Sequence, residues 1–412
     1  MLRHYFTLSV KVLLRRKVFT IISLFGIIAT LTVFVVVVAM FDHGFGPGAP
    51  ETARDRMLAV TRVSLFGDGG RMSSAHGSYA LFDRHARNLP GVEHLTIFSN
   101  AGAVESFVGG QKVSLFMKRT DGGFWRVFRF AFLEGRPFTD EDVQRADFVA
   151  VITASARERL LGGVSAVGRV VEVDGQRFTI VGVVPDVSEM KFMPFADVWV
   201  PVTTSKAPLE RDGLLGGYQA AVVADRPASL PIVRAAFDER LSRLEVPSDM
   251  QMLLAPFETP FEGVARQMFP DDDRRSKAPL LVALLTAVGL VLALLPTVNL
   301  VNLNISRVME RASEIGVRKA FGASSRALVG QFVVENVLLT LVGAALAFVV
   351  SSALLDAINQ SGLIAHAQLR VSLRVFLVGT ALAIAFGVFS GVYPAWRMSR
   401  LHPVAALKGQ AR

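Results

Sequence analysis

Long stretches without charged residues constrain this chain more than any other feature of its sequence. One lies near the N-terminus, a polar region of more than two hundred residues follows, and three lie close together towards the C-terminus. A helix needs about 20 apolar residues to cross the roughly 30 Å hydrocarbon core of a bilayer, and each stretch is long enough. The sequence therefore predicts a membrane protein with four transmembrane α-helices (1 + 3) and a large domain between the first two.

The four predicted spans are the segments 18–41, 278–306, 327–355 and 375–396. The composition agrees, because 51% of the residues are hydrophobic and 19% are charged, against about 25% charged residues in soluble domains. A cleaved signal peptide is the alternative interpretation of the first stretch, since Arg15, Arg16 and Lys17 precede it. That run is longer than the roughly 7 to 15 apolar residues of a signal-peptide core, and three more spans follow, so we favour a span.

Lysine and arginine residues predict the orientation, since they collect in short cytoplasmic segments while long domains cross regardless of charge. They are dense in the segments 1–17, 307–326 and 397–412 and sparse in the short connection 356–374. Both termini are therefore predicted to be cytoplasmic, with residues 1–17 as an interfacial helix and residues 42–277 extracytoplasmic. The net charge of +9 lies mainly beside the spans, where it meets lipid head groups, so we expect no nucleic-acid partner.

The extracytoplasmic region has the pattern of an α+β domain. Residues 148–202 alternate as strands do, and Asp174-Gly175, a dipeptide preferred in tight type I′ turns, predicts a hairpin. Further predicted elements are helices at 154–161, 78–88 and 231–244 and two strands about Gly109-Gly110. The chain contains no cysteine, so this domain must be stable without disulfides.

The residues predict no catalytic, cofactor or metal site in this chain. His76, His85 and His94 do not have the spacing of metal ligands on one helix or hairpin. Asp271–Asp273 stand directly before the second span with Arg274 next, which favours a solvated juxtamembrane linker. The G-x-S-x-G, H-E-x-x-H and Walker A patterns do not occur.

The connection 307–326 carries the most specific local pattern. Glu314 and Arg318 are four residues apart and can pair on a short amphipathic helix, on which Ile315 is apolar and Gly322 suits the C-terminal stop. Two interpretations remain from the residues alone. The segment is either a plain basic connector or a helix that a partner holds.

This segment resembles the coupling segment of MacB/FtsX-type ABC transporter permeases, whose pattern is close to E-R-x-x-E-I-G-x-R-K-A-x-G-A. The stretches 331–336, 392–403 and 149–201 are similar to the same family, so the resemblance extends over the whole chain. The resemblance implies that the residues coupling to the ATPase are Glu310, Arg311, Glu314, Ile315, Gly316, Arg318, Lys319 and Gly322.

The resemblance also implies the organisation of the outer region and its partners. A MacB-like core domain would have a porter-like lobe, about 44–125 and 208–275, with a β-rich lobe at about 126–207 inserted in it. Because only 17 residues precede the first span, we expect the ABC ATPase as a separate subunit that binds ATP and Mg. This chain would then have no enzymatic activity and no cofactor of its own.

Further partners follow from the number of spans. Four spans do not enclose a path, and paired ATPases need two docking helices, so we expect a homodimer or a heterodimer with a related permease. A periplasmic adaptor is a further candidate, and the expected location is the inner membrane of a bacterium.

Three features within the spans bear on coupling and packing. Glu335 would couple the bundle, paired with a basic group of the loop or tail. Pro296 is either a hinge or a tolerated bend. Small residues recur every fourth position of the last span and predict a helix-packing seam, within the chain or with a second copy: Gly379, Ala383, Gly387 and Gly391.

The function that these features favour is mechanical transmission. Closure of the ATPase would push the segment 307–326, tilt the spans and move the outer domain, for export of a drug, peptide, siderophore or lipid-linked ligand. The alternative is an FtsX-like scaffold that transmits ATPase motion to periplasmic enzymes or sensors without transporting a substrate. An ion-coupled transporter would need internal repeats and midplane charges, which the sequence lacks.

Overall fold

The computed structural model describes residues 15, 17–46, 48–209, 213–271, 273–291 and 325–399. The chain divides into two compact units. The helical unit comprises residues 1–42, 283–363 and 369–412, and the outer domain comprises residues 43–282 and 364–368. The segment 364–368, which connects two helices of the first unit, thus belongs with the outer domain.

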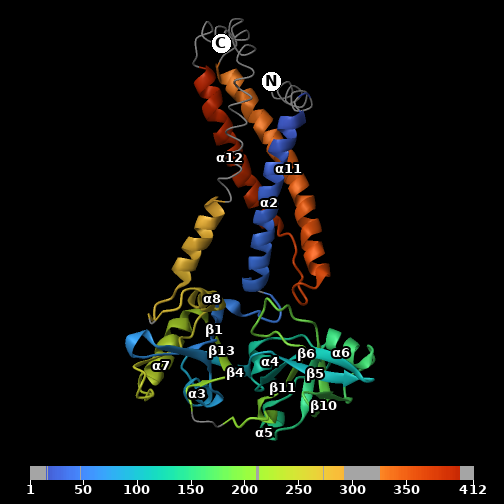
Figure 1. Cartoon of the computed structure of the whole chain (residues 1–412), viewed down its shortest axis with the longest axis vertical. Helices are drawn as coiled ribbons and strands as arrows, with labels where there is room; N and C mark the ends of the chain where they lie inside the picture. Colours follow the sequence, from blue (N-terminus) through green and yellow to red (C-terminus); the bar gives the residue numbers. More distant parts are fainter. Residues whose placement is uncertain are drawn as a thin grey trace. The chain divides into compact units, whose positions relative to one another are not determined.

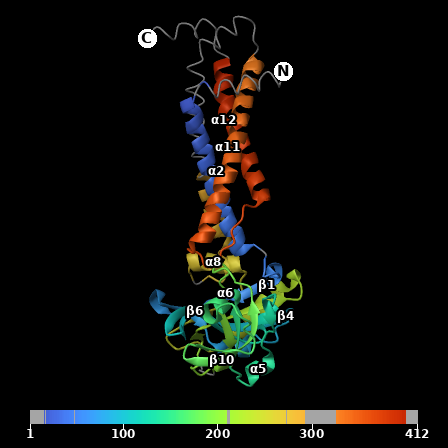
Figure 2. The same ribbon diagram turned by 90° about the vertical axis from the view of Figure 1, so that its right-hand side faces the viewer.

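The helical unit is built from α2 (Lys17–Phe45), α11 (Ser325–Ser361) and α12 (Leu373–Ser399), which run beside one another in Figures 1 and 2. Within the described residues, two helices are long and apolar enough to cross a membrane, Lys17–Phe45 and Val329–Ser361, with mean hydropathy 2.9 and 2.4. Shorter apolar helices are Ala278–Val291 and Leu373–Val388. The predicted second span continues beyond the described residues.

Side chains from all three helices form a small apolar core. Ile27 and Leu31 of α2 are buried with Leu339, Ala344 and Ala347 of α11, and Phe376 and Ala383 of α12 pack against them. Many other large apolar side chains of these helices are exposed, Phe25 and Val349 among them. Exposed apolar surface of this kind is what lipid covers in a transmembrane bundle.

The outer domain is an α+β domain, as predicted. Its described residues contain a 14-stranded mixed sheet. The strands are β1 (Met57–Val60), β2 (Val63–Phe66), β3 (Met72–Gly77), β4 (Val92–Ser99), β5 (Gly102–Val108), β6 (Gln111–Thr120), β7 (Glu134–Gly135), β8 (Val149–Thr153), β9 (Val170–Val173), β10 (Gln176–Val184), β11 (Val198–Pro201), β12 (Leu215–Gly216), β13 (Tyr218–Ala224) and β14 (Met252–Leu254). The helices are α3 (Tyr79–His85), α4 (Phe124–Val127), α5 (Asp140–Gln144), α6 (Ala154–Leu161), α7 (Leu230–Ser242) and α8 (Pro260–Met268).

The strand order is β14-β2-β3-β13-β4-β6-β11-β8-β10-β7, with β1 beside β13, β12 beside β3, β5 beside β6 and β9 beside β10. The pairs β10–β8 and β11–β6 are parallel, and the other ladders are antiparallel. The β4–β6 and β6–β11 contacts join the two ends of the domain through one sheet. The two ends are therefore connected through backbone hydrogen bonds.

Two lobes flank this junction (Figure 1). In the first, side chains of β1, β4, β13, α3 and α7 share a core that includes Phe82, Ile97 and Phe237. In the second, β8–β11 and α6 enclose another core. Leu115 and Met117 of β6 pack into that second core, although their segment was expected in the porter-like lobe.

The predicted elements of the outer domain form where their sequence signals lie. The hairpin β9–β10 is confirmed, and its turn residues Asp174 and Gly175 have φ values of 55° and 66°, as a type I′ turn requires. The predicted helix at 154–161 is α6, where the Thr153 side chain accepts a hydrogen bond from Ala156 N at 3.1 Å and Gly162 ends the helix in the left-handed region. The predicted helices at 78–88 and 231–244 are α3 and α7, and the strands about Gly109-Gly110 are β5 and β6.

One close backbone approach in this domain can be tested with a matched pair of substitutions. A Cβ atom on Gly123, at the start of α4, would lie 2.1 Å from the carbonyl oxygen of Leu95 in β4, whereas a Cβ on Gly102 would meet nothing within 4 Å. We expect Gly123→Ala to lower the free energy of unfolding of the outer domain by about 1 to 3 kcal/mol through overpacking. Thermal unfolding of the full chain in nanodiscs measures this, and Gly102→Ala should unfold close to the wild-type temperature. Equal unfolding temperatures for the two variants would contradict this packing of α4 against β4.

Candidate functional site

Residues 307–324 of the segment predicted to contact an ATPase lie outside the described residues. Its coupling residues therefore stay a prediction: Glu310, Arg311, Glu314, Ile315, Gly316, Arg318, Lys319 and Gly322. The structure describes the other parts that a mechanical coupling would use. These are the contacts among α2, α11 and α12 and the places where the outer domain holds the segments that lead to the helices.

A row of polar side chains follows one side of α11. Glu335 is buried, and the Gln331 amide donates a hydrogen bond to its Oε1 atom at 2.9 Å. One position further, Asn336 Nδ2 donates to the carbonyl of Gly387 in α12 at 3.3 Å. Thr340 Oγ1 donates to the Asn336 carbonyl at 2.9 Å. A buried polar group needs such a partner. Of these three bonds, the one from Asn336 to Gly387 joins α11 to α12 and fixes their rotation at this point, whereas the other two lie within α11.

The small residues of α12 lie against two different helices of the same chain. A Cβ atom on Gly379 would lie 2.9 Å from the Phe34 ring of α2, and one on Gly387 would lie 3.2 Å from Thr340 Oγ1 of α11. Ala383, between them, packs against the core of the helical unit. Gly391 lies in α12, but its surroundings fall outside the described residues.

A further close approach was not predicted from the sequence. A Cβ atom on Gly343 of α11 would lie 2.6 Å from Ile27 Cγ2 of α2. Gly343 follows the bulky Leu341 and Val342, and no glycine repeat marks it. A lone glycine in an apolar span gives too weak a signal to predict which neighbouring helix approaches it.

The outer domain holds the linker that precedes helix Ala278–Val291 through one buried arginine. Arg266, on α8, donates from Nε to Glu258 Oε1 at 2.8 Å. Its Nη1 atom donates to the Asp273 carbonyl at 2.8 Å, and Nη2 donates to the carbonyls of Arg274 and Arg275 at 3.4 and 3.0 Å. The planar guanidinium thus joins a carboxylate on one side to the linker backbone on the other.

Glu258 is itself attached to the sheet. Its backbone exchanges hydrogen bonds with Ala59 of β1 at 2.7 and 2.9 Å. Burial raises the pKa of Glu258 to about 7, against the attraction of Arg266. The helix α8 was not among the predicted elements, although Thr259 and Glu262 form a capping box. A capping box is a signal that the sequence carries, and here it places Glu258 directly before the helix.

Asp271 and Asp273 belong to the same linker, and both form ion pairs with Lys277, the Asp273 pair at 3.5 Å. Asp272 lies outside the described residues. Among the residues that the structure describes, no group of His, Asp and Glu is arranged to hold a metal ion. The interpretation of Asp271–Asp273 as a solvated linker stays a prediction.

The three histidines serve separate local contacts. The two ring nitrogens of His76 contact the Thr61 carbonyl and the Asn100 side chain, each through a hydrogen bond. His94 lies 3.4 Å from Glu93. His85 is on α3, beside an open hollow.

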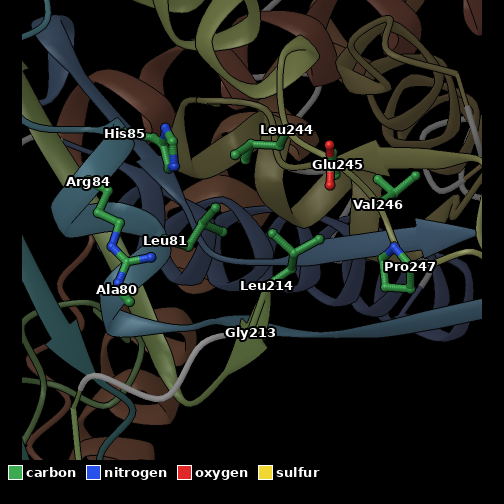
Figure 3. Close-up of a pocket in the computed structure, with 10 residues that line it drawn as sticks. All are labelled: Ala80, Leu81, Arg84, His85, Gly213, Leu214, Leu244, Glu245, Val246 and Pro247. Carbon is green, nitrogen blue, oxygen red and sulfur yellow. The ribbon is translucent and has the colours of Figure 1, made fainter.

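That hollow, of about 410 Å³, is drawn in Figure 3. Leu81, Leu214 and Leu244 gather towards its middle, with Arg84 and Glu245 on opposite sides (Figure 3). Burial, helped by the charges of Arg84 and Arg240, lowers the pKa of His85. The hollow can accept a small apolar group, and its shape alone assigns no ligand.

Comparison with known families gives matches along the chain. The family model of the MacB-like periplasmic core domain matches residues 20–240, more than half of the 412 residues. The chain belongs to the MacB/FtsX-type ABC transporter permease family. The model of the FtsX-like permease C-terminal region matches residues 286–403.

Individual relatives of this permease differ in length. The pyoverdine export ATP-binding/permease protein PvdT of Pseudomonas fluorescens is 27% identical over 394 residues, which cover 95% of this chain and 57% of PvdT. The macrolide export ATP-binding/permease protein MacB of Bdellovibrio bacteriovorus is 26% identical over 280 residues, 66% of this chain and 41% of that protein. The chain thus spans about half the length of these relatives. The uncharacterized ABC transporter permease YknZ of Bacillus subtilis is 22% identical over 416 residues, which cover 96% of each chain.

Among solved structures, the periplasmic region of MacB from Actinobacillus actinomycetemcomitans matches with a TM-score of 0.38 and 14% identity, covering 54% of this chain and 98% of that one. The outer domain of this permease accounts for most of the MacB-like match. The segment with the coupling residues and α11 and α12 lie within the FtsX-like match.

The seam between α12 and α2 generates a stability prediction. Gly379→Leu would place a side chain where the Phe34 ring lies, and we expect the free energy of unfolding of the helical unit to fall by about 1 to 3 kcal/mol. The matched control is Val378→Leu, because Val378 is 52% exposed and has room for the added atom. Thermal unfolding in nanodiscs, followed by circular dichroism, measures both. A Gly379→Leu variant as stable as the control would mean that α12 does not approach α2 at this residue.

The buried carboxyl of Glu258 generates a prediction about pH. Its pKa is raised from 4.5 to about 7 by burial, so between these values the folded chain keeps a proton that the unfolded chain has released. The free energy of unfolding therefore falls as the pH rises through this window, by roughly 1 to 3 kcal/mol from this group. In Glu258→Gln this contribution is absent, so the unfolding temperature should fall less between pH 5 and pH 7 than it does in the wild type.

The control for that comparison is Glu239→Gln, which changes an exposed carboxylate on α7 and should keep the wild-type pH dependence. The measurement is the unfolding temperature of each full-length variant across the window. Identical pH slopes for wild type and Glu258→Gln would refute the assignment.

Proposed function

We propose that this chain is the permease subunit of an ABC transporter that couples ATP hydrolysis by a separate ATPase subunit to motion of its periplasmic domain. The observation that carries the proposal is the order of the two family matches, residues 20–240 and 286–403, with the predicted coupling residues inside the second. The ATPase would bind ATP and Mg, and this chain would contribute no catalytic residue and no cofactor site.

The proposed topology has four spans with both termini in the cytoplasm. Its support is the apolar length of α2 and α11, the apolar helices Ala278–Val291 and Leu373–Val388, and the concentration of lysine and arginine in three segments. On this topology the residues from Glu310 to Gly322 face the ATPase. The outer domain and the connection 364–368 lie on the opposite side of the bilayer.

One comparison supports a separate ATPase. YknZ, named as a permease, is covered over 96% of its length by this chain, whereas PvdT and MacB are named ATP-binding/permease proteins and are covered by about half. A homodimer or a heterodimer with a related permease would supply two docking segments for a pair of ATPases.

The contacts of Arg266 suggest how motion would reach the outer domain. A displacement of the linker 273–275 acts on the guanidinium, then on Glu258, and then on β1 through the backbone bonds to Ala59. Each step is a hydrogen bond between buried or half-buried groups, which have little freedom to yield. The central pairs β4–β6 and β6–β11 then carry the motion to the second lobe.

The proposed task is export of a drug, peptide, siderophore or lipid-linked ligand, with a periplasmic adaptor as a further candidate partner. The names of PvdT and MacB, which refer to pyoverdine and macrolide export, support this task. The alternative is an FtsX-like scaffold that drives periplasmic enzymes or sensors without a transported substrate. The FtsX-like match at residues 286–403 is the observation that favours it.

The coupling segment can be tested by charge reversal. Glu314→Arg together with Arg318→Glu exchanges the two charges, while either change alone leaves two like charges four residues apart. We expect each single variant to lose at least tenfold in affinity for the ATPase, about 1.4 kcal/mol, because its docking face carries the wrong charge. Co-purification of the membrane complex and its ATP turnover measure the loss.

The control is Arg374→Glu, which reverses a charge on the opposite side of the proposed membrane topology. An ATPase that stays fully bound to both single variants would reject this segment as the docking site. Stimulation of ATP turnover by a candidate ligand would favour export, and stimulation by a periplasmic hydrolase would favour the scaffold.

A further inference from the structure

The loop between β10 and β11 contacts two segments that are far apart in the sequence. We call residues 186–195 the clamp loop. One of the two segments, Gly48–Glu51, follows α2, and the other, Ile364–Gln368, connects α11 with α12. All three belong to the outer domain.

Contacts to the first segment come from Lys191. Its Nζ atom donates hydrogen bonds to the carbonyls of Gly48 and Ala49 at 2.9 and 3.0 Å. The neighbouring Met190 side chain lies 3.6 Å from where a Cβ atom on Gly44 would stand, in the last turn of α2. The clamp loop therefore holds the chain directly where α2 ends.

Contacts to the second segment come from the start of the loop. The backbone N–H of Glu189 donates to the carbonyl of Ala365 at 3.1 Å. The carboxylate of Asp186 lies 3.9 Å from His366 Nδ1. Ala365 also packs against a third core of the outer domain, the aromatic core, which includes Phe124, Trp125 and Trp199, so this connection is anchored by both its backbone and its side chain.

The clamp loop is in turn fixed to the sheet by a second buried lysine. Lys118 of β6 donates from Nζ to the carbonyl of Phe192 at 3.1 Å and to that of Met193, and its ammonium group lies 5.0 Å from the centre of the Phe98 ring. Val187 and Met193 of the loop are buried in the aromatic core. The loop thus has an attachment in the middle of the strand order, at the junction between the lobes.

Burial makes these two lysines costly. Lys118 is 1% exposed and Lys191 is 7% exposed, and an ammonium group taken out of water loses several kcal/mol of hydration. Burial lowers the pKa of Lys118 to about 7 although Glu51 attracts its charge. Apolar residues would fill the same space at lower cost, but they could not donate hydrogen bonds to backbone carbonyls. Each lysine donates to two carbonyls, so the lysines position the backbone segments that they bind.

We propose that the clamp loop holds the end of α2 and the connection between α11 and α12 together on the β-rich lobe, with Lys191 and Lys118 as positioning residues. The proposal rests on the mechanical function above and extends it, since movement of either helix end would reach the lobe through one loop. Arg266 holds the linker 273–275 in the same way. Each described segment that connects the outer domain to a helix is therefore held by hydrogen bonds.

The first test needs no ATPase and examines the clamp alone. Hydrogen exchange of the full chain in nanodiscs should show that Lys191→Ala raises exchange at least fivefold in peptides covering both 44–52 and 364–368, while the β9–β10 hairpin keeps its wild-type protection. Lys191→Arg, which keeps a donor, should restore most of the protection. The control is Lys112→Ala, an exposed lysine of β6. Faster exchange confined to 44–52 overturns the clamp.

A second test follows the clamp in the complex with the ATPase. The chain has no native cysteine, so Arg177→Cys and Arg243→Cys, two exposed positions on different lobes, can carry spin labels without background. With the native Lys191, ATP should change the distance between the two labels. We expect this change to fall to less than half in Lys191→Ala and to be retained in Lys191→Arg. A full distance change in Lys191→Ala overturns the role of the clamp. If ATP does not change the label distance even with the native Lys191, the result counts against the mechanical function. The exchange test then still decides the clamp.

Discussion

Cationic side chains that bind backbone carbonyls are the interactions on which the outer domain of this permease depends. Arg266 holds three carbonyls of the linker 273–275, Lys191 holds two carbonyls after α2, and Lys118 holds two within the clamp loop. A carbonyl is present whatever the side chain, so these bonds fix the path of the backbone and not the identity of its residues. That is the kind of contact that can transmit displacement from one segment to another.

The helices of the helical unit pack through different interactions, because the hydrophobic effect does not drive apolar helices together in lipid. Small residues let the backbones approach, at Gly343 against α2 and at Gly379 and Gly387 against two neighbours. The Asn336 amide on α11 adds direction, since its hydrogen bond to the Gly387 carbonyl of α12 forms at one rotation of the helix. Close approach and hydrogen bonding together determine how three apolar helices pack.

The sheet links the two lobes in a way that affects the mechanism. β6 is paired with β5 and β4 and also, in parallel, with β11, so it belongs to both lobes. Lys118 lies on this strand, and its ammonium group reaches the clamp loop. This strand joins the lobes through the pairing of Thr120 with Phe98 of β4 on one side and through its ladder with β11 on the other.

Local signals in the sequence determined the two long apolar helices, the α+β character of the outer domain, the hairpin at Asp174-Gly175 and the helix at 154–161. Each depends on periodicity, turn chemistry or capping within a few residues, and such preferences act before any distant contact forms. The pattern from Glu310 to Gly322, which is predicted to couple to an ATPase, likewise depends on neighbouring residues, and with three other stretches it indicated the family.

Only the tertiary structure decided which distant residues meet. Glu258 and Arg266 are eight residues apart in the sequence, but Lys191 meets Gly48 across 143 positions, and Glu189 meets Ala365 across 176 positions. Nothing in the sequence near Lys118 or Lys191 distinguishes them from surface lysines, because the cost of burying a charge depends on the whole fold around it. The same reason explains Gly343, whose neighbour is set by the packing of α2 and not by the residues beside it.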